Sequence, residues 1–483
     1  MSQTITLQTW HEVEINLPGH MYSTICERML SCLEKEQFGI ILAGYCYRQE
    51  KAGSKRHNFL RLLGRKYIAP KENHLDYAHY TGVRITREFN TQILKTAVKQ
   101  NLCIIHVHSH PFSLGHVAFS GIDDYSEAEE TTWLGKHFPQ VIFGSIVMGQ
   151  HSIAARVWNL ANGQPQPVEV SRILGCDFPL TIVNCGGESS LAQPPDAMFD
   201  RQVRAFGIQG QQCIANLKVG IVGLGGTGSL MAEGLARLGV RRFVLVDADR
   251  VDETNRNRLL GLTETDVRKR NFKVNLARRE IRRVKSECEV CCIRVDAATA
   301  QATSDLKTCD LLVSATDNYY SRLFLQTVAQ QYLIPLLNLG VIINTFEDKI
   351  IDAFGDVQLF LPDAEQPCLL CAGQINMEAV NQELASDDLK RLMTEQGYIR
   401  NAVVPDPAVR PLNGMTANLA LELFHNLICS FTKPAFAVSY NMLRQSIEHY
   451  IYSKDQNCRI CGKEGVTGLG DTRPLTYYFD NRE

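Results

Sequence analysis

A nearly continuous apolar run at residues 217–222 predicts a buried strand of a parallel sheet. The glycine-rich stretch at residues 223–228 predicts a tight turn that leads into a helix over residues 229–239. A second apolar run, residues 243–246, ends in Asp247 about twenty residues after the glycines, where a carboxylate suits a ribose hydroxyl. This order of strand, glycine turn, helix and strand predicts an α/β domain of the Rossmann type.

Turn-forming residues mark the organisation of the rest of the chain. Residues 161–196 carry clusters of Gly, Pro, Asn and Ser, with an apolar piece at residues 180–183 that predicts a short strand. A chain of 483 residues is too long for one ordinary core. We therefore expect a first domain at residues 1–165, a connector at 166–196 and a second domain at 197–483.

Composition narrows the class of protein. The chain has 50 basic and 52 acidic residues, mixed along its length, so nothing indicates a nucleic-acid or membrane partner. The first residues lack the basic and apolar regions of a secretory signal, and no run of about 18 apolar residues occurs. Sixteen cysteines in such a chain favour metal-bound or buried thiols in a reducing compartment. We therefore expect a cytoplasmic protein.

Two histidines in the first domain suggest a metal site. His108 and His110 are two residues apart, so on an extended strand both imidazoles face the same side. Pro111 would end that strand and Gly121 permits a turn, which would place Asp123 at the start of a helix that folds back on the histidines. Two imidazoles and one carboxylate leave the fourth zinc position open for water, as in catalytic sites. The alternative is a histidine-rich strand followed by a capping turn.

The order His-x-His-Pro, a short loop and Ser-x-x-Asp resembles the JAB/MPN (JAMM) metalloproteases, which have an α/β fold similar to that of cytidine deaminase. That family also has a glutamate before an apolar strand, and Glu36 fits this position. By this resemblance, zinc is bound by His108, His110 and Asp123. Glu36 would position the attacking water and shuttle its proton, and Ser120 would donate to the oxyanion.

The second domain resembles the ThiF/MoeB/E1 adenylating family over roughly residues 196–465. The resemblance rests on the glycine turn and on polar residues that follow it, which are Gly223, Gly225, Gly226, Gly228, Asp247, Asp249, Asn255, Arg258, Lys273 and Asp317. In this family a carboxylate attacks the α-phosphate of ATP, so cations must neutralise the charge that develops. Arg258 and Lys273 would do so. Leu259 stands where many relatives have Gln, a departure that removes one polar contact.

The resemblance assigns the other roles at this site. Asp317 would bind Mg²⁺, and Asn255 would orient phosphate and metal. Asp247 would bind the ribose, with Asp249 supporting the site. Arg201 would act as an arginine finger, supplied by its own or by a second subunit. The second source implies a homodimer.

Four cysteines form two CxxC motifs at Cys368–Cys371 and Cys458–Cys461. The two-residue spacing lets both thiolates of a motif reach one tetrahedral metal, and the family resemblance implies that the two motifs share a structural zinc. The alternative is two buried or redox-active pairs.

Ubiquitin-type relatives carry a thioester-forming cysteine after the first CxxC motif. This chain has no cysteine between Cys371 and Cys429, and Cys429 is predicted to be a small buried apolar residue. The segment 376–402 is polar with helical spacing and is predicted to form a lid. The acyl group would therefore pass directly from the adenylate to another protein or to a hydroxyl, with Ser386 and Thr394 as candidates.

Together the two halves resemble the bacterial JAB–ThiF fusions of ubiquitin-like conjugation operons, some of which serve antiphage defence. The resemblance implies a bifunctional enzyme that processes or deconjugates a ubiquitin-like protein and adenylates its C-terminus, with zinc, ATP and Mg²⁺ as cofactors and an E2-like protein as a further partner. One alternative is the processing and activation of a sulfur carrier in cofactor or cysteine biosynthesis. Another is a non-catalytic scaffold that binds ubiquitin-like proteins.

Overall fold

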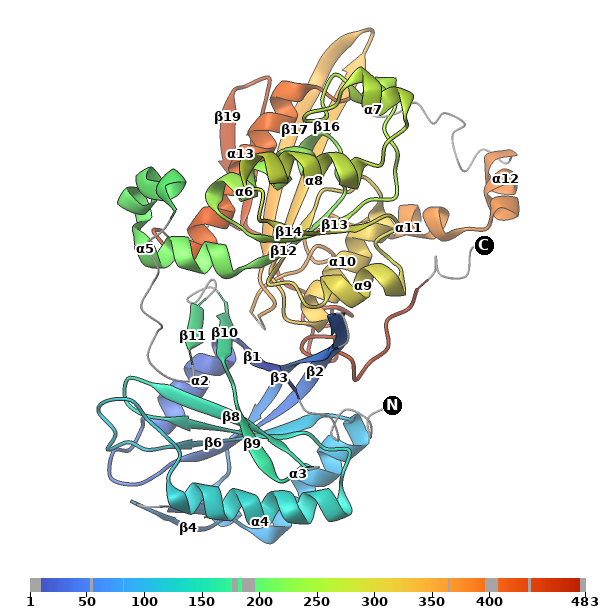
Figure 1. The fold of residues 1–483 in the computed structure, drawn as a ribbon. Coiled ribbons are helices and arrows are strands. Elements are labelled where there is room, and N and C mark those ends of the chain that lie inside the picture. Colours follow the sequence, from blue (N-terminus) through green and yellow to red (C-terminus); the bar gives the residue numbers. More distant parts are fainter. Residues whose placement is uncertain are drawn as a thin grey trace. The chain divides into compact units, whose positions relative to one another are not determined.

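The computed structural model describes residues 10–52, 55–80, 82–160, 162–175, 181–184, 196–363, 365–395, 407–432 and 436–477. It divides into two compact units. Unit 1 comprises residues 1–192 together with 331–333 and 466–475, and unit 2 comprises residues 193–330, 334–465 and 476–483. Each unit is an α/β structure with its own sheet (Figure 1).

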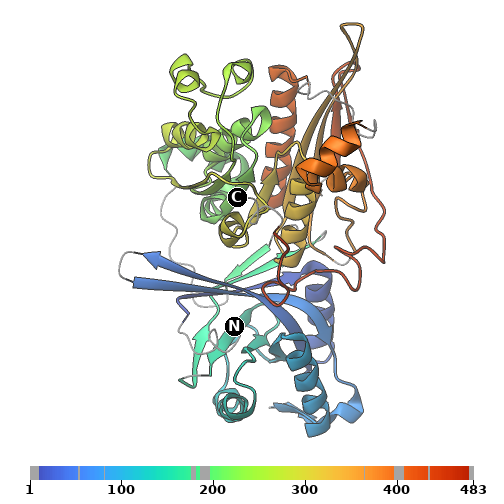
Figure 2. The ribbon, with the colours of Figure 1, turned by 90° about the vertical axis from the view of Figure 1, so that its right-hand side faces the viewer.

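A nine-stranded mixed sheet forms the centre of unit 1, in the order β11-β10-β1-β3-β2-β6-β7-β8-β9. Its strands are β1 (Glu12–Pro18), β2 (Phe38–Ala52), β3 (Lys55–Ile68), β6 (Cys103–Ser109), β7 (Phe143–Met148), β8 (Ile153–Asn159), β9 (Gln164–Pro167), β10 (Val170–Leu174) and β11 (Thr181–Asn184). A separate hairpin joins β4 (Leu75–His79) and β5 (Gly82–Ile85). The strand β1 pairs in parallel with β3 and β10, and β6 with β7. The long antiparallel pair β2–β3 is seen in Figure 2.

Helices pack on the two faces of this sheet. They are α2 (Gly19–Met29), α3 (Arg87–Gln100) and α4 (Gly121–His137), with a 3-10 turn, η1, at Glu72–His74. Successive side chains of a strand point to opposite faces. Ile41 of β2 therefore packs in one core cluster with Met21 and Ile25 of α2. Its neighbour Ile40 packs in the other cluster with Phe89 of α3.

The extent of unit 1 differs from the expected domain boundaries. Residues 166–196 were expected to be a connector, but β10 and β11 lie inside this segment and extend the sheet. The strand β11 does match the short strand expected at residues 180–183. Residues 466–475, expected in the second domain, pack in unit 1, where the backbone N–H of Asp471 donates to the carbonyl of Tyr45 at 2.6 Å. Both differences arise because the pairing partners are distant in sequence and leave no local signal.

Unit 2 is built on an eight-stranded sheet in the order β14-β13-β12-β15-β16-β17-β18-β19. Its strands are β12 (Lys218–Val222), β13 (Arg242–Val246), β14 (Glu289–Ile293), β15 (Leu311–Ser314), β16 (Leu336–Phe346), β17 (Lys349–Phe360), β18 (Ala437–Asn441) and β19 (Ser446–His449). The first five in spatial order pair in parallel and the rest are antiparallel. The predicted strands at residues 217–222 and 243–246 are confirmed. The strand order reverses at β12, and in open α/β sheets ligands bind outside the carboxyl ends of the strands at such a point, here β12 and β15.

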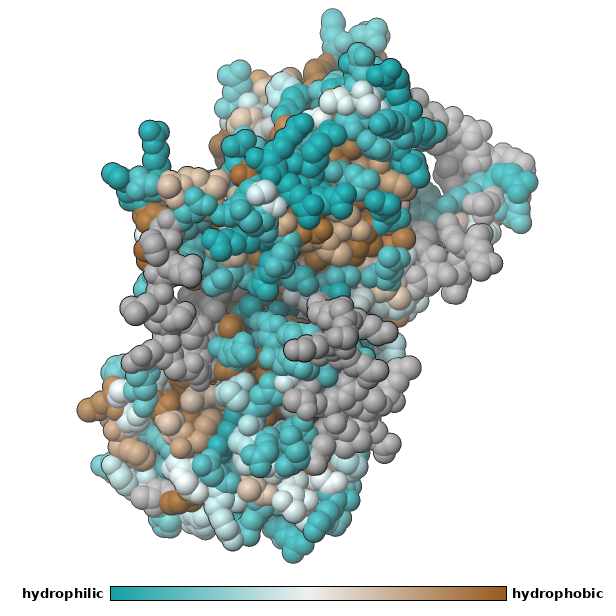
Figure 3. Space-filling view, in the orientation of Figure 1, coloured by the Kyte–Doolittle hydropathy of each residue, from teal (hydrophilic) through white to brown (hydrophobic). Residues whose placement is uncertain are grey.

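The helical elements of unit 2 are η2 (Ala197–Phe199), α5 (Asp200–Asn216), α6 (Gly226–Leu238), η3 (Glu253–Asn255), α7 (Glu264–Arg268), α8 (Lys273–Val284), α9 (Ala300–Leu306), α10 (Tyr319–Gln331), α11 (Met377–Leu384), α12 (Asp387–Glu395) and α13 (Arg410–Cys429). The helix expected at residues 229–239 is α6, which begins three residues earlier. The predicted helical spacing of segment 376–402 is confirmed by α11 and α12, and residues 396–402 lie outside the described part. Hydrophilic side chains cover the outward face of α8 (Figure 3). Among the described residues, no helix is long and apolar enough to cross a membrane.

Candidate active sites and metal centres

The end of β6 and the start of α4 bring three expected ligands together in unit 1. His108 lies in β6, His110 directly follows the strand, and Ser120 caps α4 by accepting a hydrogen bond from the backbone N–H of Asp123 at 3.2 Å. The helix start expected after Gly121 is therefore confirmed. Asp123 Oδ1 lies 3.2 Å from His108 Nε2, and its Oδ2 lies 3.4 Å from His110 Nε2. One ligand atom from each residue lies within 4.8 Å of the others, so all three can face one cation.

Burial and electrostatics at this cluster fit a divalent cation. Among the described residues, the buried Nε2 of His108 has no hydrogen-bond partner of good geometry, and a cation would satisfy it. Burial opposes the ionisation of Asp123, but its close contacts with the imidazoles of His108 and His110 outweigh burial and hold the pKa of Asp123 far below its usual range. Burial would lower the pKa of His110, yet the hydrogen bond and charge of Asp123 and the charge of Glu36 raise it. Metal ligation needs a neutral imidazole and an ionised carboxylate, so a bound cation would compete with protons for these atoms.

Glu36 and Ser120 flank the cluster in different ways. The backbone N–H of Glu36 donates to the carbonyl of His79 at 3.0 Å, and its Oε1 lies 3.8 Å from His110 Nε2. Burial raises the pKa of Glu36, which suits a group that takes and returns a proton near neutral pH. The hydroxyl of Ser120 donates to Asp123 Oδ2 at 2.7 Å. Ser120 therefore orients the carboxylate of Asp123, and this bond must break before the hydroxyl can donate to an oxyanion.

An aromatic pair that the sequence reasoning missed lies beside the cluster. The ring of Phe112 stacks on His110 with centroids 5.5 Å apart, and it contacts Tyr80 at 4.7 Å. Phe112 is 43% exposed and Tyr80 is 52% exposed. Exposed aromatic rings of this kind offer contact area for a binding partner. The available signal was the place of Phe112 directly after the His-x-His-Pro motif.

The glycine turn of unit 2 packs backbone against backbone at the carboxyl end of β12. Gly223 has φ +84°, and a Cβ atom there would clash with the carbonyl of Ala315. A Cβ atom on Gly228 would clash with the carbonyl of Gly223. The helix α6 begins at Gly226, and its N-cap residue Gly225 makes no side-chain capping bond. The amides of the first turn of α6 are therefore available to a phosphate.

A carboxylate pair and a lysine lie next to this turn. Asp247 follows β13 and accepts hydrogen bonds from the backbone N–H groups of Leu224 (2.7 Å) and Asp249 (2.8 Å). Burial raises the pKa of Asp247. The Nζ of Lys273 lies 2.7 Å from Asp249 Oδ2, and the backbone N–H of Lys273 donates to the carbonyl of Asp249 at 3.0 Å. The structure thus brings together Asp247, Asp249 and Lys273, as expected for one site.

Further polar residues surround the first turn of α6. Asn255 is buried in η3, and Arg258 follows three residues later. A Cβ atom on Gly226 would clash with the amide of Asn413 and lie 3.3 Å from Arg258 Cδ. Arg410 fixes this arrangement, because its Nη1 donates to the carbonyl of Arg258 at 2.9 Å. The sequence reasoning gave no role to Arg410 or Asn413, although a buried Asn in the first turn of a long helix was a usable signal.

Asp317 lies near the glycine turn, whereas Arg201 lies far from it. Asp317 follows β15 at the carboxyl edge of the sheet, and its charge contributes to raising the pKa of Lys273, against the effect of burial and after Asp247 and Asp249. Arg201 lies in the first turn of α5. Its neighbour Gln202 donates to the carbonyl of Leu238, at the C-terminal end of α6, at 3.3 Å. The helix α6 has 13 residues and therefore spans about 20 Å at 1.5 Å per residue. Arg201 therefore lies at the end of α6 away from the glycine turn.

The four cysteines of the two CxxC motifs converge in unit 2. Cys368 Sγ lies 3.8 Å from Cys371 Sγ and 3.6 Å from Cys458 Sγ, and Cys371 Sγ lies 3.5 Å from Cys461 Sγ. All four sulfur atoms are within 4.8 Å of one another. Thiolates in a tetrahedron with metal–sulfur bonds of about 2.3 Å are about 3.8 Å apart. The donor set and spacing therefore fit one zinc ion, and the four cysteines would fill all four of its coordination positions.

Cys429, Ser386 and Thr394 are the residues considered as acyl acceptors in place of a thioester-forming cysteine. Cys429 ends α13, half-buried, and burial raises its pKa to about 11, so little thiolate forms near neutral pH. The hydroxyl of Ser386 accepts a hydrogen bond from a backbone amide of α12. The side chain of Thr394 lies outside the described residues. Leu259 is buried in an apolar cluster with Leu276, which explains why an apolar residue is tolerated there.

The chain is similar in sequence to several known proteins. A tRNA threonylcarbamoyladenosine dehydratase of Bacillus subtilis is 34% identical over 142 residues, which are 29% of this chain and 55% of that protein. A sulfur carrier protein ThiS adenylyltransferase of the same organism is 30% identical over 132 residues, covering 27% of this chain and 39% of that protein. These matches thus span about half or less of each relative. A molybdopterin-synthase adenylyltransferase of Escherichia coli is 23% identical over 269 residues, or 55% of this chain and 96% of that protein.

Among solved structures, E. coli MccB with MccA-N7isoASN matches with a TM-score of 0.45 and 18% identity, over 56% of this chain and 75% of that one. The sequence model of the ThiF family matches residues 199–460, more than half of the 483 residues and nearly all of unit 2. The chain therefore belongs to the ThiF family.

Proposed function

We propose that this chain carries two activities that act on the same kind of terminus. Unit 2 would activate the C-terminal carboxylate of a ubiquitin-like or sulfur-carrier-like protein with ATP, and unit 1 would be a zinc-dependent protease that cuts next to such a terminus. The observation that carries the proposal is the occurrence in one chain of an N,N,O ligand set in unit 1 and of a glycine turn, with Lys273 paired to Asp249 near it, in unit 2.

Adenylation needs positive charge around the phosphates of ATP. The attacking carboxylate forms a bond to the α-phosphorus while the bond to pyrophosphate breaks, so negative charge grows on both phosphate groups. The free amides of α6 would bind phosphate oxygens, and Arg258 and Lys273 would neutralise the departing pyrophosphate. A Mg²⁺ ion would supply further positive charge between phosphate oxygens. Asp317 would hold that ion, Asn255 would orient the phosphates, and Asp247 with Asp249 would bind the ribose side.

The position of Arg201 supports a shared site in a homodimer. An arginine side chain is much shorter than α6, so Arg201 cannot reach the glycine turn at the other end of that helix in its own unit 2. A second copy of the chain would have to supply it. This is why we expect the adenylating form to be a dimer.

Proteolysis in unit 1 would use the buried ligand set. A zinc ion held by His108, His110 and Asp123 would polarise the scissile carbonyl and make a water molecule more acidic. Glu36, whose pKa is raised by burial, would take the proton of the attacking water and give it to the departing amine. Phe112 would contact the extended peptide on one side.

The two activities fit one sequence of events. The protease exposes a C-terminus, the adenylating site activates it, and the protease also reverses conjugates. Bacterial ubiquitin-like conjugation, including antiphage defence, is the pathway we propose. Sulfur-carrier activation is the second candidate, favoured by the names of two relatives, the ThiS and molybdopterin-synthase adenylyltransferases. A non-catalytic scaffold would not need the catalytic residues, so their presence argues against it; they are Glu36, His108, His110, Asp123, Arg258, Lys273 and Asp317.

The test is mass spectrometry of the purified full-length protein with ATP and a ubiquitin-like protein encoded beside it. We expect the tagged precursor to lose its C-terminal extension and the product to gain AMP. Transfer to an E2-like protein would support conjugation, and transfer of sulfur from a sulfurtransferase would support the second candidate. Absence of both cleavage and AMP addition would refute the proposal.

A further inference from the structure

The helix that supplies the Asp123 ligand has an unusually polar buried face. The buried residues of α4 are Glu127, Thr131 and Leu134, and only the last is apolar. A surface helix normally docks through a wide apolar stripe. Hydrophobic burial alone therefore contributes little to docking α4 on the sheet. A metal ligand on the first turn of this helix, however, must be positioned accurately.

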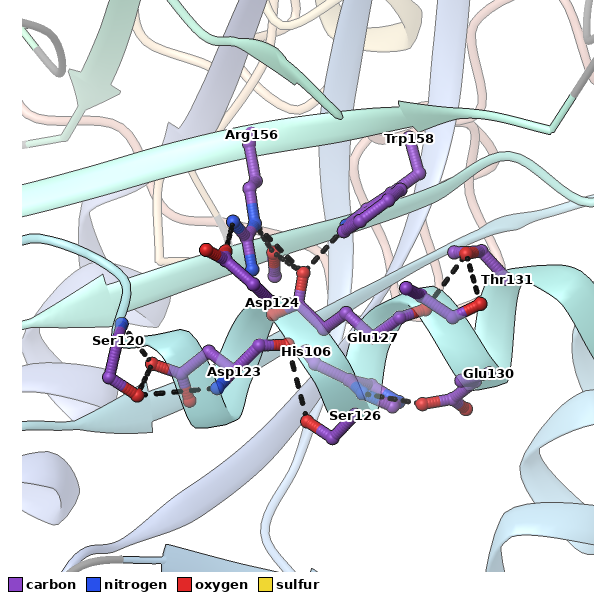
Figure 4. A network of polar contacts seen from close by, with 12 residues as sticks. His106, Ser120, Asp123, Asp124, Ser126, Glu127, Glu130, Thr131, Arg156 and Trp158 are labelled. Atoms are coloured by element: carbon purple, nitrogen blue, oxygen red, sulfur yellow. Dashed lines mark hydrogen bonds and ion pairs between the residues drawn. The ribbon is translucent and has the colours of Figure 1, made fainter. Parts of the chain in front are cut away.

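Instead, polar side chains of β7 and β8 bind α4 to the sheet (Figure 4). One carboxylate oxygen of Glu127, Oε2, accepts three hydrogen bonds. The donors are Ser145 Oγ at 2.8 Å, Arg156 Nε at 2.9 Å and Trp158 Nε1 at 2.6 Å. All four side chains are buried, and Ser145 is paired with Arg156 across the two strands. Glu127 thus ties one turn of α4 to two neighbouring strands.

Arg156 also contacts residues before and after Ser120, the N-cap residue of α4. Its Nη1 lies 2.5 Å from Asp124 Oδ1, and its guanidinium lies 3.8 Å from the centre of the Phe119 ring. Phe119 precedes the cap Ser120 and Asp124 follows the ligand Asp123. One buried arginine therefore holds the chain immediately before and immediately after the segment that presents the carboxylate.

We infer that Glu127 is a positioning residue for the unit 1 metal site. It lies one helical turn after Asp123 and holds Arg156 in the orientation that fixes residues 119–124. Among the described residues, no side-chain hydrogen bond or ion pair joins Glu127 or Arg156 to His108, His110 or Asp123, so the effect of Glu127 would pass through the backbone of α4. This inference rests on the proposed zinc site, and it adds a supporting residue that the metal ligands themselves do not reveal. Supporting partners outside the ligand set typically change metal affinity by about 10- to 100-fold.

The test is zinc binding by the full-length protein, measured by competition with a chelating indicator. A His108→Ala variant reports the four-cysteine site alone, so its difference from the unchanged protein isolates the unit 1 site. Glu127→Gln should weaken zinc at that site by about tenfold and change the visible absorption of Co²⁺ bound there. Trp158→Phe removes one donor and should give a smaller change in the same direction. Glu129→Gln, on the exposed face of α4, is the matched control and should leave both readouts unchanged.

Each outcome decides one question. Unchanged zinc affinity and Co²⁺ absorption in Glu127→Gln would overturn the inference, even if that variant is less stable, because the cluster would then only support the fold. If Glu127→Gln does not fold, unchanged values in Trp158→Phe overturn it. Equal zinc content in the unchanged protein and in His108→Ala would instead refute the zinc site of the proposed function.

Discussion

Glu14 is the best place to test the energetics of unit 1. It lies in β1, and its Oε2 is 2.7 Å from Arg61 Nε and 2.7 Å from Arg172 Nη1. The side chains of Glu14 and Arg61 are 4% and 1% exposed. Replacing Glu14 with Gln keeps the size of the side chain but leaves two buried guanidinium groups without its charge. We expect this single substitution to destabilise unit 1 strongly.

The magnitude follows from the ionisation of Glu14. Burial works to raise its pKa, but the charges of Arg61 and Arg172 outweigh burial and lower it from 4.5 to about 2. One pKa unit corresponds to about 1.36 kcal/mol, so the ionised form contributes about 3 kcal/mol to folding. Removing one partner of a buried ion pair costs a comparable ~3–5 kcal/mol. We therefore expect Glu14→Gln to lower the free energy of unfolding of unit 1 by about 3 kcal/mol.

Tryptophan fluorescence during urea unfolding is a selective assay. The three tryptophans of the chain, Trp10, Trp133 and Trp158, all lie in unit 1, so the signal does not report unit 2. Glu129→Gln makes the same chemical change at an exposed position of unit 1, and we expect it to cost less than about 0.5 kcal/mol. A loss in Glu14→Gln no larger than in this control would refute the reasoning.

The pH dependence gives a second check on Glu14. Because its folded pKa is lowered, its contribution is fully present above pH 4.5 and is lost as the pH falls toward about 2. The difference in stability between the unchanged protein and Glu14→Gln should therefore be constant near neutral pH and shrink below pH 4.5. A difference that does not shrink there would mean that the lost stability comes from packing and not from charge.

Four further predictions concern the two sites. Glu36→Ala should keep zinc bound yet abolish cleavage of a tagged precursor, and unchanged cleavage would contradict its role as the proton shuttle. Cys368→Ser should remove one zinc ion per chain and lower the melting temperature of unit 2, whereas retained zinc would favour separate thiol pairs. Arg201→Ala and Asp317→Ala subunits, each inactive in ATP–pyrophosphate exchange, should partly complement on mixing; no recovery would exclude a shared site. Any covalent adduct should resist dithiothreitol and yield to hydroxide, so a reductant-labile adduct at Cys429 would show that a thiol is used.

Local patterns in the sequence predicted the strands and helices that carry both candidate sites. The apolar runs, the glycine turn and Asp247 predict β12, α6 and β13 because each depends on neighbours within a few residues. The start of α4 was predicted from Pro111 and Gly121 for the same reason. The two CxxC motifs lie 90 residues apart from cysteine to matching cysteine, and it was the family resemblance, together with their equal spacing, that implied a shared site.

Long-range polar pairs could not be predicted in the same way. Arg172 lies in a segment rich in turn-forming residues, and only the pairing of β10 with β1 places it beside Glu14. Glu127 looks like one of several acidic residues on α4, and nothing local shows that Arg156 and Trp158 converge on it. Such contacts depend on strand order, which local propensity does not determine.

The two helix N-termini at these sites show how one physical feature serves opposite chemistries. Each helix follows a strand end, and each N-terminus carries partial positive charge on unpaired amides. In α6 the cap residue is Gly225 and no side chain occupies the amides, so their positive charge is left for a phosphate. In α4, the hydroxyl of Ser120 accepts a hydrogen bond from the backbone N–H of Asp123, and the carboxylate of Asp123 accepts one from the backbone N–H of Ser120. The positive charge of this N-terminus therefore stabilises the ionised form of Asp123. The α6 site can therefore attract an anion, whereas the α4 site presents a carboxylate and attracts a cation.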